Sequence, residues 1–338
     1  MIPTRMVVVV VVLFAGFMAT AASPRPPDST RQQQIAPYLT PQKLVPIEDG
    51  RTINLVCIGH GSPTVILTAG LGEWSLTWRL VQGPLARQTR ICAWDRAGYG
   101  FSSPSQESQD VAHTTDDLEK ALQTAGIQGP YVMVGHSLGA YEALRFTDLH
   151  RKSVLGMVLV DPAIPDQAAL MERIAPLFAT KARAIDEALV QQLQRCAAEL
   201  RGGALKRSSP QFERCTAAPA VPALFPGLKA AISRLNAEPA RLLTQASTVK
   251  EFDSDAAHDS REVINAQRRY GNMPLIVLTA GLDRSAILQM FSAEPPPGVC
   301  GVAQADCEVP SGCVGSGSRS LRLPVNSGTQ PIGTRLRP

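Results

Sequence analysis

Residues 131–140 read YVMVGHSLGA, and this stretch decides the fold. The apolar run 131–134 is typical of a short β-strand, and the following LGAYEALRFTDLH is typical of a helix. Between them lies Gly135-His136-Ser137-Leu138-Gly139, the pattern G-x-S-x-G. In a strand–turn–helix setting this pattern predicts a strained turn that exposes the Ser137 hydroxyl, because a Cβ at 135 or 139 would collide with a neighbouring strand or helix. The hydroxyl then lies at a helix N-terminus, where free N–H groups favour a developing negative charge.

The length and composition indicate one large domain, and the N-terminal residues indicate that it is exported. The chain has 338 residues, 44% of them hydrophobic, and a formal net charge of +4 that is too small to indicate a nucleic-acid partner. Arg5, the apolar run 7–18 and Ala19-Thr20-Ala21 are typical of a cleaved signal peptide, and the run is short for a bilayer span. We therefore expect residues 1–22 to be a signal peptide, with an uncleaved anchor as the alternative. The domain is then secreted or periplasmic, with no stable membrane span after signal removal.

The order of segments predicts an α/β architecture. After a Pro- and Gln-rich linker at 23–41, one domain covers 42–290. Its first strands are joined by tight turns and should form an antiparallel edge, and the later strands alternate with helices, which predicts a mainly parallel sheet with helices on both faces. Residues 164–270 have a helical period interrupted by prolines and predict a helical cap over the carboxyl ends of the strands. Residues 291–338 show no strand or helix period and predict an irregular tail, so we expect the last strand to be absent.

Export makes the cysteines informative, because disulfides form in oxidising compartments. Cys196 and Cys215 lie in one polar, helix-rich region and could close a short loop as a disulfide. Cys57 and Cys92 lie in strand-like runs, and we interpret them as buried thiols. The remaining three cysteines lack the paired C-x-x-C spacing and histidine partners of a zinc site, so no metal is expected. No dinucleotide fingerprint or phosphate-binding loop is found in the sequence, so no cofactor is expected either.

Three segments together resemble the α/β-hydrolase superfamily, in particular its lid-bearing esterase, lipase and peptidase-like branches. They are the turn around Ser137, TVILTAGLGEWSLTW at 64–78 and CAWDRAGYGFSSP at 92–104, and the likeness covers about residues 44–285. The resemblance implies an α/β-hydrolase fold and a small-molecule ester or related acyl substrate attacked by Ser137. It also implies an oxyanion hole made by the backbone N–H groups of Leu71 and Leu138. We interpret Asp95 and Arg96, in the third segment, as residues that fix loops.

The acid and the base of such a site are harder to place. The resemblance makes Asp283, which follows the strand-like LIVLTA, and Asp161, which ends the strand-like VLVD, alternative candidates for the acid. The base should be a histidine that follows the acid, but none follows Asp283. The histidines are His60, His113, His136, His150 and His258. His136 adjoins Ser137, and neighbouring side chains in a strand point apart.

The missing base suggests a cause at the end of the sequence. We hypothesise that the residues after about 286 are not the ancestral C-terminus, and that a frame shift or truncation replaced the segment that bears the base. The other two reading frames of the gene test this, since one of them should encode a strand, a histidine and a helix. On this hypothesis the chain is a serine hydrolase whose catalytic activity is impaired or absent. The alternative is a non-catalytic protein of the same fold that binds a small apolar ligand or a protein partner.

The signal peptide gives the first testable prediction. We expect cleavage after Ala21 or Ala22, because these small residues follow an apolar run of signal-peptide length. N-terminal sequencing of the protein recovered from the periplasm or medium of an expressing cell measures this directly. Recovery of a chain that still begins at Met1 would contradict it.

Overall fold

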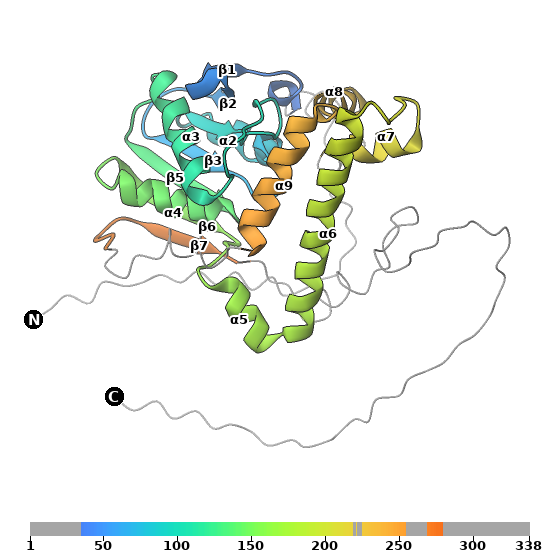
Figure 1. Cartoon of the computed structure of the whole chain (residues 1–338). Helices are drawn as coiled ribbons and strands as arrows, with labels where there is room; N and C mark the ends of the chain where they lie inside the picture. Colours follow the sequence, from blue (N-terminus) through green and yellow to red (C-terminus); the bar gives the residue numbers. More distant parts are fainter. Residues whose placement is uncertain (1–34, 219–220, 222–224, 255–268, 280–338) are drawn as a thin grey trace, which may run out of the picture. The chain divides into compact units, whose positions relative to one another are not determined.

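The computed structural model describes residues 35–218, 221, 225–254 and 269–279. These residues include a seven-stranded sheet with the order β1-β2-β4-β3-β5-β6-β7 (Figure 1). The strands are β1 (Lys43–Pro46), β2 (Thr52–Ile58), β3 (Thr64–Thr68), β4 (Ile91–Trp94), β5 (Tyr131–His136), β6 (Val154–Val160) and β7 (Leu275–Leu278). β2 is antiparallel to β1 and β4, whereas β4, β3, β5, β6 and β7 are parallel. The expected mainly parallel sheet is confirmed, but the expected antiparallel edge is wrong for β3, which lies between β4 and β5 and runs parallel to both.

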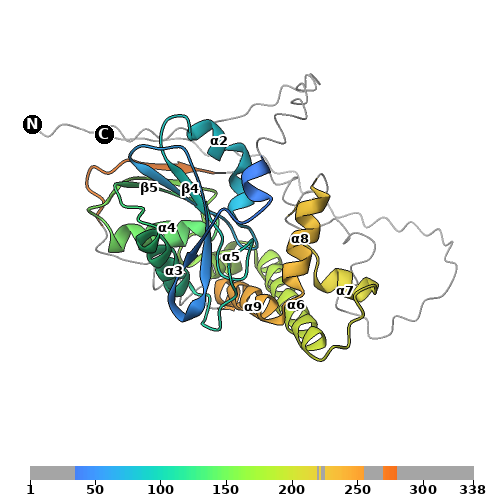
Figure 2. The ribbon, with the colours of Figure 1, turned by 90° about the horizontal axis from the view of Figure 1, so that it is seen from above.

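Helices cover both faces of the sheet, as the alternating pattern predicted (Figure 2). On one face lie α3 (Val111–Thr124) and α4 (Gly139–Leu149), and on the other lie the 3₁₀-helix η3 (Ser75–Leu80) and α2 (Gln82–Leu85). Successive side chains of a strand point to opposite faces. Ile66 therefore packs in the cluster that includes α3 and α4, while its neighbour Leu67 packs around Trp78 of η3. Each apolar face of the sheet thus has its own covering layer. Two further short 3₁₀-helices are η1 (Ala36–Tyr38) and η2 (Glu48–Gly50).

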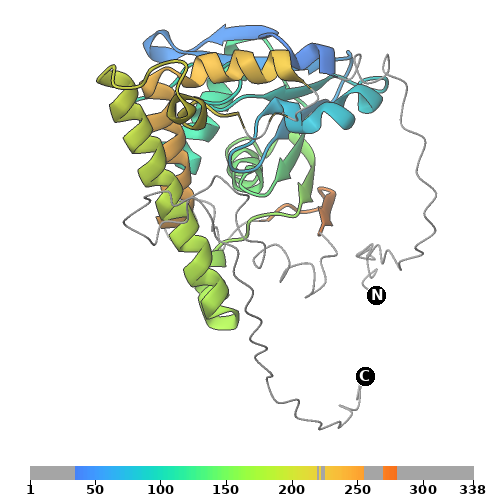
Figure 3. The same ribbon diagram turned by 90° about the vertical axis from the view of Figure 1, so that its right-hand side faces the viewer.

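Five helices lie in the described part of the range expected as a cap. They are α5 (Gln167–Ile174), α6 (Pro176–Arg201), α7 (Pro210–Cys215), α8 (Pro226–Asn236) and α9 (Pro239–Ser254). The long α6 and α9 lie side by side (Figures 1 and 3). Arg241 of α9 is 2% exposed, and its guanidinium donates to the carbonyl oxygens of Gly100 at 2.8 Å and Ser102 at 2.6 Å. Buried hydrogen bonds therefore fasten α9 to the loop that follows β4.

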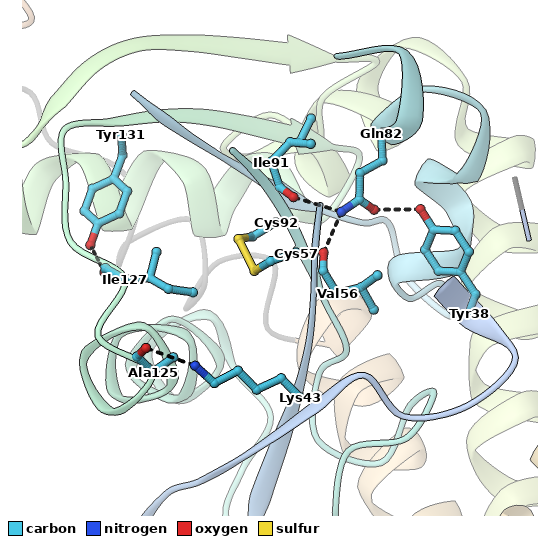
Figure 4. Close-up of a disulfide and its surroundings, with 10 residues drawn as sticks. All are labelled: Tyr38, Lys43, Val56, Cys57, Gln82, Ile91, Cys92, Ala125, Ile127 and Tyr131. Carbon is cyan, nitrogen blue, oxygen red and sulfur yellow. Dashed lines mark hydrogen bonds between the residues drawn. A yellow bond between two sulfur atoms is a disulfide. The ribbon is translucent and has the colours of Figure 1, made fainter. Parts of the chain in front are cut away.

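Two disulfides connect the described cysteines. The bond between Cys196 and Cys215 joins α6 to α7, as the sequence suggested. The interpretation of Cys57 and Cys92 as thiols is wrong, because these residues face each other across β2 and β4 with their Cα atoms 4.0 Å apart and form the second disulfide (Figure 4). Beside it the Gln82 amide donates to a carbonyl oxygen of each strand, that of Val56 at 2.5 Å and that of Ile91 at 3.0 Å. The disulfide and this amide hold the same two strands together.

Several sequence-based expectations concern residues outside the described part. These are the signal peptide (1–22), the first part of the linker (23–34), Asp283, His258 and the tail (291–338). At the other end of the expected linker, Ile35 and Tyr38 are buried, and the Tyr38 hydroxyl donates to the Gln82 amide oxygen at 2.6 Å. Among the described residues, no helix combines the length and the apolar character that crossing a bilayer requires.

A buried ion pair lies where β3, β4 and α4 meet. Arg96 follows β4 and is 2% exposed, and Glu142 in α4 is fully buried. The guanidinium contacts both carboxylate oxygens, at 2.5 and 2.7 Å, and donates to the carbonyl oxygens of Ala69 at 2.5 Å and Gly70 at 3.0 Å. Asp95 is likewise buried and accepts hydrogen bonds from the N–H of Ser75, where the loop after β3 enters η3, and from the N–H of Phe101 in the loop after β4. The interpretation of Asp95 and Arg96 as loop-fixing residues is therefore confirmed.

The glycines at the Ser137 turn give a prediction about stability. A Cβ at Gly135 would lie 2.4 Å from the Gly139 carbonyl oxygen, and a Cβ at Gly139 would lie 2.4 Å from that of Thr68. Backbone must move to relieve such contacts, so Gly139→Ala should lower the free energy of unfolding by about 2 kcal/mol or more. The control is Gly227→Ala in α8, where the added Cβ meets nothing. Equal urea midpoints for the two variants would contradict the close packing.

The buried ion pair gives a second prediction. Arg96→Met leaves the Glu142 carboxylate buried without its cation, which should cost about 3–5 kcal/mol in the free energy of unfolding. Lys120→Met is the control, because it breaks an ion pair with Glu48 whose side chains are 36% and 67% exposed and should cost about 1 kcal/mol at most. Urea unfolding measures both values. A similar small loss in both variants would mean that the buried pair does not hold this junction.

Candidate active site

Ser137 has the strained backbone that the sequence predicted. β5 ends at His136, and Ser137 turns the chain into α4 with a φ of +49°. Residues other than glycine seldom adopt this left-handed conformation, which costs on the order of 1–3 kcal/mol and persists only where the surroundings enforce it. Here the Ser137 N–H donates to the Val160 carbonyl at 3.1 Å, and the Ser137 carbonyl accepts from the N–H groups of Ala140 at 2.9 Å and Ala163 at 3.1 Å. Bonds to β6 and to the chain after it therefore hold the turn.

The turn after β3 presents the N–H group of Leu71. In a planar trans peptide unit the C=O and N–H bonds point in opposite directions. The Gly70 carbonyl accepts from Arg96 at 3.0 Å and from the Glu73 N–H at 3.3 Å, which closes a turn over residues 70–73. The N–H of Leu71, in the same peptide unit, must point away from Arg96. No described residue accepts a hydrogen bond from it.

The same reasoning applies to Leu138. The Ser137 carbonyl is held by two N–H groups, so the Leu138 N–H in that peptide unit points the other way, and no described residue accepts from it. The side chains of Leu71 and Leu138 pack in one cluster together with Tyr141. The structure thus places the two N–H groups named from the sequence on neighbouring turns, and neither donates to a described residue.

A histidine–carboxylate pair lies beside these turns. Nδ1 of His136 is 2.9 Å from Oε2 of Glu73, which also accepts from the Gly70 N–H at 2.9 Å. The hydrogen bond to Glu73 raises the pKa of His136 above its usual value, although partial burial opposes the shift. Burial acts to raise the pKa of Glu73, but the bonds from His136 and Gly70 outweigh it and lower that pKa. His136 therefore contacts Glu73, in keeping with the expectation that it does not serve Ser137.

The structure places one of the two candidate acids. The register pairs His136 with Val160, so Asp161 follows β6 beside Ser137 at the carboxyl edge of the sheet. Asp161 has a φ of +42°, and its N–H donates to the Leu278 carbonyl at 2.6 Å. Asp283 lies outside the described residues, so the structure does not decide between the two.

No described histidine is hydrogen bonded to the Ser137 hydroxyl. Three of them contact carboxylates: His113 with Asp110 at 2.8 Å, His136 with Glu73 at 2.9 Å and His150 with Glu119 at 3.2 Å. His60 is exposed in the turn after β2. His150 follows the last residue of α4, at the opposite end of that helix from Ser137. His258 lies outside the described residues.

Sequence reasoning missed Glu73, which accepts from the Gly70 N–H, and Glu142, which pairs with Arg96. A signal for Glu142 was present, because this acidic residue stands among the apolar residues of α4 that face the sheet, and a charge in such a stripe indicates a buried partner. Glu73 carried no comparable signal, since its partner His136 is 63 residues away. Within the described residues, no group of three His, Cys, Asp or Glu side chains is placed to hold a metal ion.

A cavity of about 330 Å³ lies between the cap and the turn that carries Leu71. Its size is within the usual range for small-molecule sites. Leu71 and Trp74 form its wall on the core side, and Leu193 and Ile232 belong to its wall on the cap side. The disulfide between α6 and α7 also lines it. Leu71 lines this cavity, whereas Ser137 and Leu138 are not among its lining residues.

Comparisons with known proteins found relatives that match part of this chain. YbdG of Bacillus subtilis is 26% identical over 121 residues, which are 35% of this chain and 37% of YbdG. YqjL of the same organism is 32% identical over 111 residues, 33% of this chain and 44% of YqjL. RutD of Klebsiella pneumoniae strain 342, a proposed carbamate hydrolase, is 33% identical over 102 residues, 30% of this chain and 38% of RutD. The chain thus spans less than half the length of these curated relatives.

One solved structure and one family model extend the comparison. ALR0039 of Nostoc sp PCC 7120, a proposed alpha/beta hydrolase, matches with a TM-score of 0.52 and 21% identity over 71% of this chain and 80% of that chain, a likeness of fold alone. Residues 63–286 match the family model described as alpha/beta hydrolase fold. Because this match covers more than half of the sequence, the chain belongs to the alpha/beta hydrolase fold family.

Proposed function

We propose that the chain is a serine hydrolase of an ester or a related acyl compound, with Ser137 as the nucleophile. One observation carries the proposal. Next to the strained Ser137, the N–H groups of Leu71 and Leu138 have no acceptor among the described residues, and hydrogen bonds to the adjoining carbonyls fix both in direction. Preorganised donors of this kind stabilise the oxyanion of an acyl-transfer reaction, and each is worth about 10²–10³ in kcat.

The chemistry follows from these positions. Ser137 Oγ loses its proton and forms a bond to the acyl carbon, and the carbonyl oxygen becomes an oxyanion that accepts from Leu71 and Leu138. Collapse of this intermediate breaks the bond to the alcohol oxygen, which takes up a proton as the alcohol leaves. Water then loses a proton and attacks the acyl-serine, and the same two donors hold the second oxyanion. Its collapse breaks the bond between the acyl carbon and Oγ, Ser137 regains a proton, and the acid is released. The proposal involves no cofactor.

The acid and the base limit the rate. Asp161, beside Ser137, and Asp283 are the proposed alternatives for the acid. No described histidine serves as the base, and a serine hydroxyl is hardly ionised at neutral pH. Loss of one member of a catalytic triad leaves about 10³–10⁴-fold acceleration over water, from the oxyanion hole and binding. We therefore propose a slow hydrolase, unless His258 supplies the base.

The surroundings of the site suggest a substrate and a compartment. The apolar cavity beside Leu71 supports a small apolar acyl group. Two disulfides support an exported domain, secreted or periplasmic, because such bonds persist in oxidising compartments.

A second candidate function is binding without catalysis. The observation that favours it is that the Ser137 hydroxyl has no histidine partner among the described residues, although the cavity is present. Such a protein would hold a small apolar ligand or a protein partner under its cap. It would bind the ligand, but a fluorophosphonate would not label its Ser137.

Labelling and hydrolysis with a matched control decide between these functions. We expect the purified protein to react slowly with a fluorophosphonate and to hydrolyse a short p-nitrophenyl ester far below the ordinary ~10 per second. Ser137→Ala should abolish both reactions, and Ser153→Ala, an exposed serine before β6, should change neither.

Two outcomes would contradict this proposal. Equal hydrolysis by the Ser137→Ala protein would point to a contaminating enzyme or another nucleophile. Turnover near ~10 per second would mean that a base is present. In that case His258→Ala and His150→Ala show whether either histidine supplies it, because only loss of the base removes this rate.

A further inference from the structure

We propose that Glu73 and His136 are positioning residues: as an ion pair they hold the turn at 70–73 against the turn at Ser137 and so fix the oxyanion hole. The inference rests on the proposed function of Leu71 as an oxyanion donor. It concerns a pair that neither the sequence pattern nor the family match singles out.

The first step concerns the two peptide units that precede Leu71. They contain four polar groups, and three of them are bonded. The Ala69 carbonyl accepts from Arg96 at 2.5 Å, the Gly70 N–H donates to Glu73 at 2.9 Å, and the Gly70 carbonyl accepts from Arg96 at 3.0 Å. Only the Leu71 N–H is left for a substrate. Without Glu73 the Gly70 N–H loses its acceptor, and glycine is the residue whose backbone rotates most easily.

The second step concerns the link to Ser137. His136 directly precedes Ser137 in the chain, and its Nδ1 lies 2.9 Å from the Glu73 carboxylate. A Cβ at Gly70 would be 3.0 Å from this nitrogen and 3.0 Å from Oε2 of Glu73, so both side chains pack directly on Gly70. The pair therefore joins the turn that carries Leu71 to the turn that carries Leu138. These are the two halves of the proposed oxyanion hole.

The third step concerns charge. Glu73 and Asp161 favour the protonated form of His136, whereas Arg96 opposes it, and the hydrogen bond to Glu73 has the largest effect. The pKa of His136 is raised and that of Glu73 is lowered, so both are charged between these two pKa values. The stabilisation that His136 contributes is complete below its ordinary pKa of 6.5 and is lost as pH rises through the raised value. The stabilisation from Glu73 is lost as pH falls through its lowered value.

The experiment uses the full chain and readouts that do not depend on activity. In an NMR titration, Glu73→Ala should bring the pKa of His136 back down towards its ordinary value. Hydrogen exchange of the peptide that contains residues 69–73, followed by mass spectrometry, should become faster in the same variant. Glu73→Gln should also lower the pKa of His136 but should slow exchange relative to Glu73→Ala, because the amide oxygen still accepts from Gly70. His113→Asn, which changes the separate histidine–carboxylate contact with Asp110, is the control and should change neither exchange nor hydrolysis.

Kinetics add the functional readout. For Ser137-dependent ester hydrolysis, Glu73→Ala should lower kcat by up to about 100-fold with KM little changed, since a misplacement of ~1 Å in a donor costs on this order. We expect wild-type hydrolysis to decline at alkaline pH as His136 deprotonates, and we expect Glu73→Gln to lack this decline.

The outcomes separate this inference from the proposed function. If the wild-type protein does not hydrolyse the ester, or if Ser137→Ala hydrolyses it equally well, the proposed function fails, while the titration and exchange results still decide whether the pair holds the turn. An unchanged His136 pKa together with unchanged exchange in Glu73→Ala would overturn the inference even in an active enzyme. So would an unchanged kcat in Glu73→Ala when exchange at 69–73 has risen.

Discussion

The buried ion pair between Arg96 and Glu142 connects the fold to the site. A guanidinium removed from water needs an acceptor for each of its N–H directions, because a buried donor left unpaired is costly. The Glu142 carboxylate satisfies part of this need, and the carbonyls of Ala69 and Gly70 satisfy most of the rest. The same hydrogen bonds that offset the free-energy cost of burying the Arg96 guanidinium therefore set the direction of the backbone before Leu71. Stability of the junction and orientation of the proposed oxyanion donor have one physical cause.

This junction exists only because two segments of the chain approach closely. Gly139 lies against the Thr68 carbonyl, and a Cβ there would lie 2.4 Å from it, so glycine alone lets the start of α4 touch the end of β3. That contact brings Glu142, in the first turn of α4, to the Thr68 hydroxyl and to Arg96. Gly139 thus allows both the turn that exposes Ser137 and the burial of the ion pair between Arg96 and Glu142. The need for glycine at this position, which arises from the turn at Ser137, thus also determines how β3, α4 and Arg96 contact one another.

The range of each interaction explains which features the sequence predicted. The strained turn at Ser137 and the helix after it depend on neighbouring residues, so the pattern G-x-S-x-G was sufficient to predict them. The place of β3 in the sheet and the bond between Cys57 and Cys92 depend on strand order and register, which no local pattern contains. Glu73 and His136 belong to the same class, because folding alone brings them together. The choice between Asp161 and Asp283 stays open, because only Asp161 is among the described residues.

The site divides into two halves that depend on different parts of the chain. The bonds that fix Ser137 and Leu71 come from residues between β3 and the segment after β6, such as Arg96 and Ala163. β7 contributes none of them, and its four side chains are each 44–53% exposed, although it pairs with β6. The half that holds Ser137 and the N–H groups of Leu71 and Leu138 therefore keeps its geometry without hydrogen bonds from β7. In the proposed hydrolase the rate would depend on whether another residue supplies a base, so a fixed turn at Leu71 and a working base are separate requirements.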